Sequence, residues 1–256
     1  MERVIYTAVV AGKDEVSLPV VPPGWRRVCF TDGPTYRGWE NLPAFSSFSD
    51  PVRNAKIHKI LPHRFFPLAE VSLWIDGNVE VSCDLDELVE SYLRNSDIAV
   101  HKHRERQCIY DEAMACIELE KDVPEVILKQ ITRYKSEGYP ANAGLAECTI
   151  VLRRHTTAVR ALDELWWQEI TQGSRRDQLS FNYVMKKLAM SYVVFESHLF
   201  EGPLFTVHPH AILGYPRKRS WAFADNSKVE DFLSRFQTAN LLRKLQQYAN
   251  RWISDR

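Results

Sequence analysis

The step Asp76-Gly77-Asn78 is the place where residue types and spacing point most directly to chemistry. It interrupts an apolar, β-rich run, with Trp74-Ile75 before it and Val79 after it. A carboxylate inside a buried strand is costly unless a partner pairs with it. Divalent cations prefer such oxygen ligands, and glycine lets the backbone approach a ligand closely. The step therefore predicts a metal site with Asp76 and Asn78 as ligands. The alternative is a hairpin turn that pairs residues 79–81 back onto residues 72–75.

Three cations precede this step at intervals of three residues. Arg53, Lys56 and Lys59 fall in a predicted helix over residues 53–61, which Pro62 ends. Residues three apart are neighbours on a helix surface, and such cations suit a diphosphate. We expect Arg53 and Lys56 to neutralise a phosphate-bearing leaving group. Solvated surface charge is the alternative.

Histidines near predicted strand ends are the next candidates. His101 and Arg104 follow a predicted short strand over residues 97–100, where they would contact the ligand or only cap the strand. His208 and His210 flank a proline late in the chain. We expect one of these two imidazoles to complete the coordination of the metal. Plain loop histidines are the alternative.

The run Arg175-Arg176-Asp177-Gln178 concentrates charge at a predicted helix start. Such a terminus offers free N–H groups to anions. Arg176, Asp177 and Gln178 are the predicted catalytic residues, with Asp177 as the general base toward an acceptor hydroxyl. In the alternative interpretation, Asp177 forms a capping box with Ser174. A second acidic pattern, Asp84-Leu85-Asp86, is predicted to cap a helix rather than to bind a ligand.

The elements that must position these residues alternate along the chain. Strands are predicted over residues 4–10, 27–31, 71–75, 97–100, 149–152 and 191–195. Helices are predicted over residues 53–61, 84–93, 110–120, 124–136, 157–171, 174–188 and 229–253. This alternation predicts an α/β fold with a largely parallel sheet. Ligands bind beyond the carboxyl ends of such strands, where we place Gly12, Asp32, Asp76, His101 and Arg153.

Composition bounds the class of protein. Among 256 residues, 33 Lys and Arg balance 33 Asp and Glu, which argues against a nucleic-acid partner. Five cysteines without a Cys-x-x-Cys pair favour a reducing, cytoplasmic compartment. We expect residues 1–215 to form a catalytic domain and residues 216–256 a helical extension packed on it. The alternative is that residues 229–256 lie on an anionic inner membrane surface.

Several short stretches together resemble a known family, the glycosyltransferase-like domain of bacteria and plants related to mucilage and turgor regulation. They span residues 4–210 and comprise Phe30–Asp32, Arg53-x-x-Lys56, Ser72–Asn78, His101-x-x-Arg104, Tyr110–Ala113, Glu137–Pro140, Gly144-Leu145, Arg153–His155, Trp166-Trp167 and Arg175–Phe181. The resemblance implies a Rossmann-like GT-A sandwich. It also implies transfer of a sugar from a nucleoside-diphosphate donor to a hydroxyl of a saccharide or glycoconjugate, assisted by Mn²⁺ or Mg²⁺.

The resemblance also implies roles for single residues. Asp76 and Asn78 stand where the Asp-x-Asp metal motif of this fold stands, although Asn78 is a neutral and weaker ligand. Asp32 would lie near the nucleoside, and Asp177 near the acceptor. Because of Asn78, a rival hypothesis is a non-catalytic module that binds a glycan or a nucleotide on the same fold.

Overall fold

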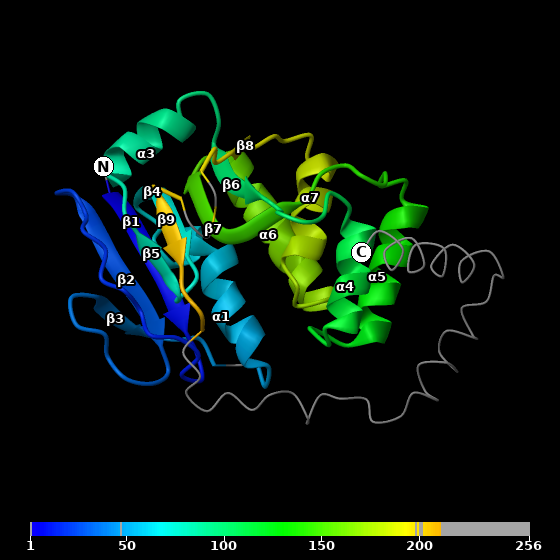
Figure 1. The fold of residues 1–256 in the computed structure, drawn as a ribbon, viewed down its shortest axis with the longest axis horizontal. Helices are drawn as coiled ribbons and strands as arrows, with labels where there is room; N and C mark the ends of the chain where they lie inside the picture. Colours follow the sequence, from blue (N-terminus) through cyan, green and yellow to red (C-terminus); the bar gives the residue numbers. More distant parts are fainter. Residues whose placement is uncertain (1, 47, 198, 200–201, 211–256) are drawn as a thin grey trace.

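A seven-stranded sheet forms the centre of the molecule (Figure 1). The computed structural model describes residues 2–46, 48–197, 199 and 202–210. The sheet has the order β3-β2-β1-β4-β7-β6-β8. Its strands are β1 (Glu2–Val9), β2 (Trp25–Thr31), β3 (Glu40–Pro43), β4 (Ala69–Ile75), β6 (Ile98–Lys102), β7 (Ala146–Arg154) and β8 (Val193–Val194). All neighbouring pairs are parallel except those of β7, which runs antiparallel to β4 and β6. The predicted α/β fold with a mostly parallel sheet is confirmed.

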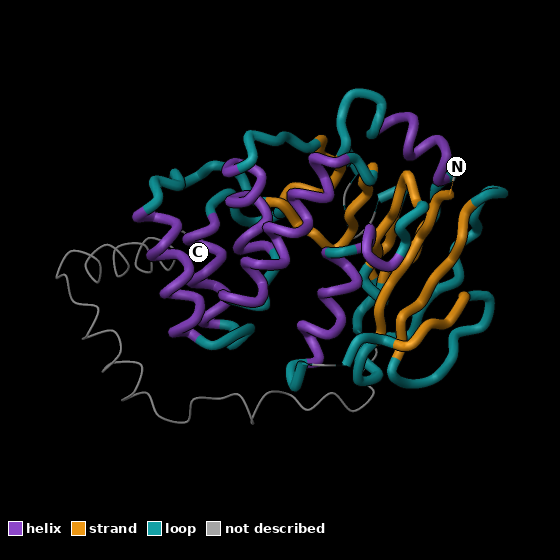
Figure 2. Tube along the Cα trace, turned by 180° about the vertical axis from the view of Figure 1, so that it is seen from behind, coloured by secondary structure: helices purple, strands orange, loops and turns teal. Residues whose placement is uncertain are grey.

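Helices cover both faces of this sheet, as Figures 1 and 2 show from opposite sides. They are α1 (Pro51–Ile60), α2 (Pro62–Phe65), α3 (Leu85–Tyr92), α4 (Ile109–Glu118), α5 (Pro124–Ser136), α6 (Thr157–Gln172) and α7 (Gln178–Lys187). Alternate residues of β1 enter two different cores. Val4 and Tyr6 pack with residues of α1, α6 and α7, whereas Ile5 and Val9 pack with residues of α3.

A second, two-stranded sheet lies beside the turn that carries Asp76. It pairs β5 (Val79–Val81) with β9 (Phe205–Val207) in antiparallel fashion. The alternative of a hairpin at this turn is therefore wrong, because β5 pairs with a segment more than a hundred residues later and not with β4. The sequence did not predict β3 or β9, and it offered residues 79–81 as a strand only in the hairpin alternative, since strands of three or four residues carry too few positions for a period to be visible.

The predicted elements differ from the structure mainly at their ends. The helix predicted from residue 174 begins at Gln178, and the strand predicted over residues 191–195 has two residues. The predicted helix over residues 229–253, the extension over residues 216–256 and its membrane contact lie outside the described residues. Within the described residues, no helix is both long and apolar enough to span a bilayer.

Candidate active site

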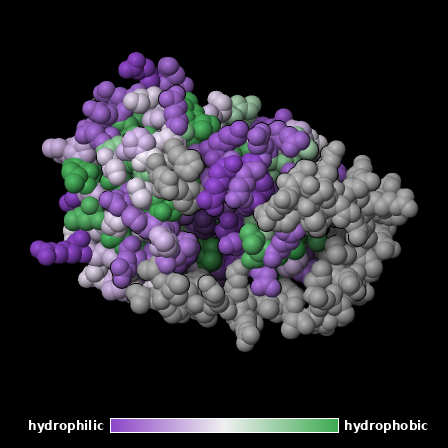
Figure 3. Space-filling view, viewed as in Figure 1, coloured by the Kyte–Doolittle hydropathy of each residue, from purple (hydrophilic) through white to green (hydrophobic). Residues whose placement is uncertain are grey.

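A cavity of ≈ 950 Å³ opens where β1 and β4 end and β7 begins. Its walls come from α1, the turn after β4, the start of β7, the start of α7 and the residues after β9. Seven cationic side chains line it: Lys13, Lys56, Lys59, Arg104, Lys121, Arg175 and Arg176. Its lining carboxylates are Asp76, Glu147 and Asp177. Hydrophilic side chains also gather around a hollow in the middle of the face that Figure 3 shows. Cations exceed carboxylates, so the cavity suits an anionic ligand.

Two lysines of α1 share the carboxylate of Asp177, the residue just before α7. The Nζ atoms of Lys56 and Lys59 each lie 2.6 Å from Oδ2 of Asp177. The side chains of Lys59 and Asp177 are 1% and 4% exposed, so this is a buried ion-pair cluster. Each charge of this cluster requires its partner, because a buried charge without a partner strongly destabilises the folded protein.

The pKa values of this cluster follow from burial and mutual attraction. Burial would raise the pKa of Asp177, but Lys56, Lys59 and Arg176 outweigh it and hold that pKa far below its usual range. Burial lowers the pKa of Lys56 to about 8, although Asp177 opposes the shift. Burial would also lower the pKa of Lys59, but Asp177 and Asp76 raise it. Lys56 is therefore the member whose charge changes closest to neutral pH.

Asp76 lies at the edge of this cluster, and about a third of its side chain is exposed. Its Oδ1 accepts a hydrogen bond of 2.8 Å from Nε1 of Trp74 and lies 3.6 Å from Nζ of Lys59. Burial would raise the pKa of Asp76, but Lys59 and Lys56 lower it. Asp76 thus remains a carboxylate because cations of the protein compensate its charge.

Asn78 has a structural partner. The side-chain Nδ2 of Asn78 donates to the backbone carbonyl of His208 over 2.6 Å. The backbone carbonyl of Asn78 accepts from the backbone N–H of His208 over 2.9 Å. These two bonds extend the pairing of β5 with β9 by one step. Asn78 therefore fastens the segment after β9 to the turn after β4.

The four predicted metal donors do not gather around one point. Nε2 of His208 pairs with Glu80 over 2.7 Å, and Nδ1 of His210 pairs with Asp14 over 2.6 Å. Among the described residues, no group of three or more His, Cys, Asp or Glu is placed to hold a metal ion. In this arrangement Asp76, Asn78, His208 and His210 do not fit a divalent-metal site. The requirement for Mn²⁺ or Mg²⁺ stays a prediction.

Asp177 occupies the position before α7 but does not cap it. No cap hydrogen bond reaches its side chain, which turns toward α1 instead. The backbone N–H of Ser174 donates to Gln130 over 2.9 Å instead of to Asp177, and its hydroxyl accepts from the backbone N–H of Arg176, so Ser174 and Asp177 form no capping box. The capping interpretation is wrong here, because two lysines that are distant in sequence compete for the carboxylate. The role of Asp177 as a general base stays a prediction.

Three predicted site residues are absent from the described lining of the cavity. Arg53 pairs with Asp50 and donates to the carbonyls of Ile170 and Gly173. The carboxylate of Asp32 accepts from the backbone N–H of Ala11, and His101 is buried against two phenylalanines. Their predicted contacts with a ligand are therefore not supported. Lys56, Arg104, Arg176 and Gln178 do line the cavity, as do the four predicted metal donors.

Arg153 lies away from the predicted edge of the sheet. It faces Ser72 in the register of β7 and β4, and its guanidinium pairs with Asp163 over 2.5 Å. Because β7 runs antiparallel, its carboxyl end lies at the opposite edge from that of β4. The start of β7 reaches the cavity instead, which brings Glu147 and Cys148 into the lining.

Sequence reasoning missed several lining residues besides these two. Lys13 follows a glycine after the first strand, so strand-end reasoning could have found it. Lys121 was missed as well; its carbonyl accepts a hydrogen bond from the guanidinium of Arg175, which belongs to the predicted run over residues 175–178. No sequence signal joins them, since only the packing of α4 and α5 near α7 brings them together.

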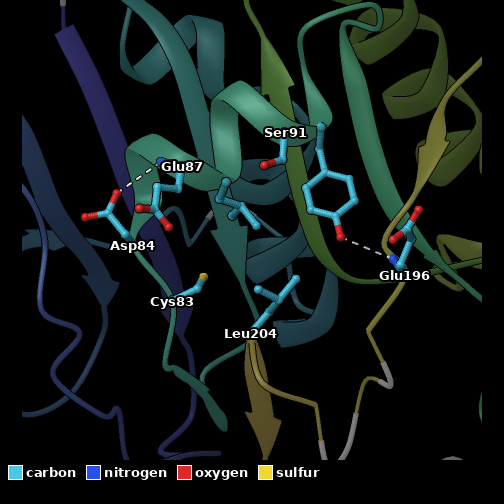
Figure 4. Close-up of a pocket in the computed structure, with 8 residues that line it drawn as sticks. Cys83, Asp84, Glu87, Ser91, Glu196 and Leu204 are labelled. Atoms are coloured by element: carbon cyan, nitrogen blue, oxygen red, sulfur yellow. Dashed lines mark hydrogen bonds between the residues drawn. The ribbon is translucent and has the colours of Figure 1, made fainter.

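A smaller pocket of ≈ 300 Å³ lies along α3 (Figure 4). Asp84, Glu87 and Glu196 contribute carboxylates, and none of its described lining residues is Lys or Arg. Asp84 accepts from the backbone N–H groups of Asp86 and Glu87, which confirms its predicted capping role. This pocket does not suit an anionic ligand, so the larger cavity is the candidate active site.

Comparisons with known proteins find one matching family model and two relatives from a plant. A model of the family described as the TOD1/MUCI70 glycosyltransferase-like domain matches residues 43–206. The chain is 35% identical over 159 residues to the "Probable hexosyltransferase MUCI70" of Arabidopsis thaliana, covering 58% of this chain and 27% of that protein. It is 27% identical over 167 residues to "Alkaline ceramidase TOD1" of the same plant, covering 60% and 36%. The chain thus spans about a third or less of these relatives.

Solved structures of glycosyltransferases are similar at low identity. One is involved in the glycosylation of the major capsid of PBCV-1; it shares 10% identity at a TM-score of 0.45, over 81% of this chain and 93% of that one. The bifunctional glycosyltransferase WbbM shares 13% identity at a TM-score of 0.39, over 76% and 38%.

Proposed function

This chain belongs to the TOD1/MUCI70 glycosyltransferase-like domain family, and from that premise we propose that it transfers a sugar from a nucleoside diphosphate to a hydroxyl. The acceptor is a hydroxyl of a saccharide or glycoconjugate. One observation carries the choice of donor: the cavity at the carboxyl edge of the sheet is lined by seven cations. A diphosphate is an anionic group of the kind that such a lining stabilises.

The reaction breaks the bond between the anomeric carbon and a diphosphate oxygen. The electron pair of that bond moves to the diphosphate, while the acceptor oxygen bonds to the anomeric carbon and releases its proton to water. Fixed cations accelerate such a step when they face the charge that develops on the leaving group. Lys56, Lys59 and Arg176 supply this charge in our proposal.

Asp177 keeps the two lysines in place. A carboxylate whose pKa lies far below the usual range takes up a proton poorly near neutral pH. The ion pairs with Lys56 and Lys59 therefore favour an orienting role for Asp177 over the role of general base. In this role it resembles other groups that fix the rotamers of catalytic side chains.

The described cysteines support a reducing compartment as the place of this reaction. Cys29, Cys83, Cys108, Cys116 and Cys148 are all free thiols. Free thiols persist where disulfides are kept reduced. We therefore place the reaction in the cytoplasm.

The test offers the purified protein a panel of nucleotide sugars with and without Mn²⁺ and measures released nucleoside diphosphate. Lys56→Met is expected to lower the rate by about tenfold or more, since one cation facing the leaving group is lost. Lys129→Met serves as the matched control, because Lys129 is exposed on α5. Equal rates in both variants, or no release from any donor, contradict the proposal.

A binding module without turnover is the second candidate function. The observation that favours it is the bond from the Asn78 amide to the His208 carbonyl, which engages part of the predicted metal motif. Thermal stabilisation by nucleoside diphosphates without release from any donor and acceptor pair would select this candidate over transfer.

A further inference from the structure

Glu147 is one of the three carboxylate residues that line the cavity. It is the second residue of β7 and lies opposite His101 of β6 in the register of these strands. Thr149, two residues further on, accepts a hydrogen bond from the backbone N–H of Asp76. Glu147 therefore lies close to the turn that carries Asp76, at the edge where parallel strands of this fold class bind ligands.

The carboxylate of Glu147 differs from the two others that line the cavity. Asp177 has two lysines, and Asp76 has the Trp74 indole and Lys59. Glu147 is 9% exposed, and its Oε2 is buried without any hydrogen-bond partner among the described residues. A buried polar atom without a partner costs stability, so such atoms are rare in folded proteins. A ligand hydroxyl would remove this cost once the side chain turns this oxygen toward the cavity.

Two adjacent residues at the start of β7, Glu147 and Cys148, line the cavity in different electrostatic surroundings. Successive residues of a strand point to opposite faces. Cys148 lies near Lys56, Lys59 and Asp177, whose charges act on its thiol. Glu147 points to the other face, where burial raises the pKa of its carboxyl group, Arg104 opposes the shift, and Glu112 and Asp76 add to it. The carboxylate of Glu147 thus lies apart from the lysine cluster that we assign to the diphosphate.

We propose that Glu147 accepts a hydrogen bond from a sugar hydroxyl and so helps to determine which sugar the cavity binds. This inference rests on the proposed function. A phosphate would be repelled by a carboxylate, whereas a hydroxyl is a neutral donor that a carboxylate binds well. Sites built to hold a hydroxyl discriminate strongly against analogues that lack it, because the protein group is then left unpaired. The hydroxyl belongs either to the transferred sugar or to the acceptor.

The experiment compares Glu147→Gln with the wild type in two calorimetric titrations. The ligands are uridine or guanosine diphosphate alone and the same nucleotide bearing a hexose. If the hydroxyl belongs to the transferred sugar, the dissociation constant of the hexose conjugate is expected to rise about tenfold to hundredfold. That of the bare diphosphate stays unchanged. Glu118→Gln makes the same chemical change at an exposed position of α4 and should alter neither constant.

Steady-state kinetics identifies the source of the hydroxyl. A raised KM for the acceptor, with donor affinity unchanged, assigns the hydroxyl to the acceptor and also supports the inference. Equal weakening of diphosphate and conjugate overturns it, as does a variant with unchanged affinities and KM values. If Glu147→Gln does not fold, Glu147→Asp keeps the charge and is expected to weaken the sugar selectively. A wild type that binds no nucleoside diphosphate removes the proposed function itself, and with it this inference.

Discussion

At the residue scale, the central feature is a carboxylate shared by two lysines. The sequence identified Lys56, Asp76 and Asp177 as candidates but not their pairing, because Lys56 and Asp177 are 121 positions apart. It also grouped Arg53 with the lysines. An α-helix turns about 100° per residue, so each step of three residues drifts by about 60°. Arg53 is therefore about 120° around the helix from Lys59, and it contacts α6 instead of the cavity.

The first prediction separates these two neighbouring cations. Arg53→Met should lower the melting temperature, because it removes hydrogen bonds to the carbonyls of Ile170 and Gly173 and the pair with Asp50. Its affinity for nucleoside diphosphate should stay near that of the wild type. Lys56→Met should weaken that affinity about tenfold. Thermal denaturation and calorimetric titration of both variants check this. A loss of affinity in Arg53→Met, with the affinity of Lys56→Met unchanged, would show that Arg53 and not Lys56 binds the ligand.

The second prediction concerns pH and Lys56. Because burial lowers the pKa of this lysine to about 8, its charge is present at pH 7 and largely lost by pH 9. Affinity for nucleoside diphosphate should therefore fall as pH rises from 7 to 9. Arginine stays protonated over this range, so Lys56→Arg should show a flatter profile. A wild-type profile as flat as that of the arginine variant would contradict a role for the Lys56 charge.

The third prediction concerns the stability that Asp177 provides. Its pKa is lowered on folding, so its ionised form stabilises the protein above the unfolded-state pKa and less as pH falls below it. Asp177→Asn should cost about 3–5 kcal/mol at pH 7, because two buried lysines lose their partner. The variant should also lose less stability between pH 5 and pH 3 than the wild type. Urea unfolding at several pH values measures both effects, and parallel pH profiles would exclude this role.

At the element scale, the direction of β7 decides which residues meet. The alternation of strands and helices predicted the α/β class correctly but carried no information on an antiparallel strand within the sheet. That strand brings Glu147 to the cavity and takes Arg153 to the interior, where it pairs with Asp163. The bounds of α5 could be predicted from Pro124 in its first turn and Gly138 beyond its end, because these signals are local. The direction of a strand relative to its neighbours depends on the tertiary fold, and no local sequence signal indicates it.

The fourth prediction concerns the turn between β4 and β5. A Cβ atom added at Gly77 would lie 2.9 Å from Cβ of Asp14 and 3.3 Å from Cγ2 of Val9. Gly77→Ala should therefore displace the Asp14 loop and cost about 1–3 kcal/mol of stability. At Gly33 the nearest atom would lie 3.9 Å away, so Gly33→Ala is the matched control. Equal unfolding free energies for the two variants would contradict this close packing.

At the scale of the whole molecule, the cavity is assembled from nearly the full described chain. Its lining begins at Ala11 and ends at His210. Motif reading found the separate contributions after β4 and before α7, since each sits on a local pattern. It identified most of the lining cations one by one but missed Lys13 and Lys121, and it could not show that the seven line one cavity, because they meet only when the sheet and helices have packed. The sequence therefore predicted the general class of function, but it did not predict that cations outnumber carboxylates in the lining of the cavity.

The pairing of β5 with β9 has a consequence for how the protein folds. Val79 pairs with Val207, so one wall of the cavity depends on a contact between segments separated by most of the described chain. Contacts of such long sequence separation form slowly, because a large loop must close first. During synthesis, the strands up to β7 leave the ribosome well before residue 205. During folding, affinity for nucleoside diphosphate should thus appear after most of the secondary structure has formed. The time at which a refolding sample begins to bind the nucleotide would then show when β5 and β9 pair.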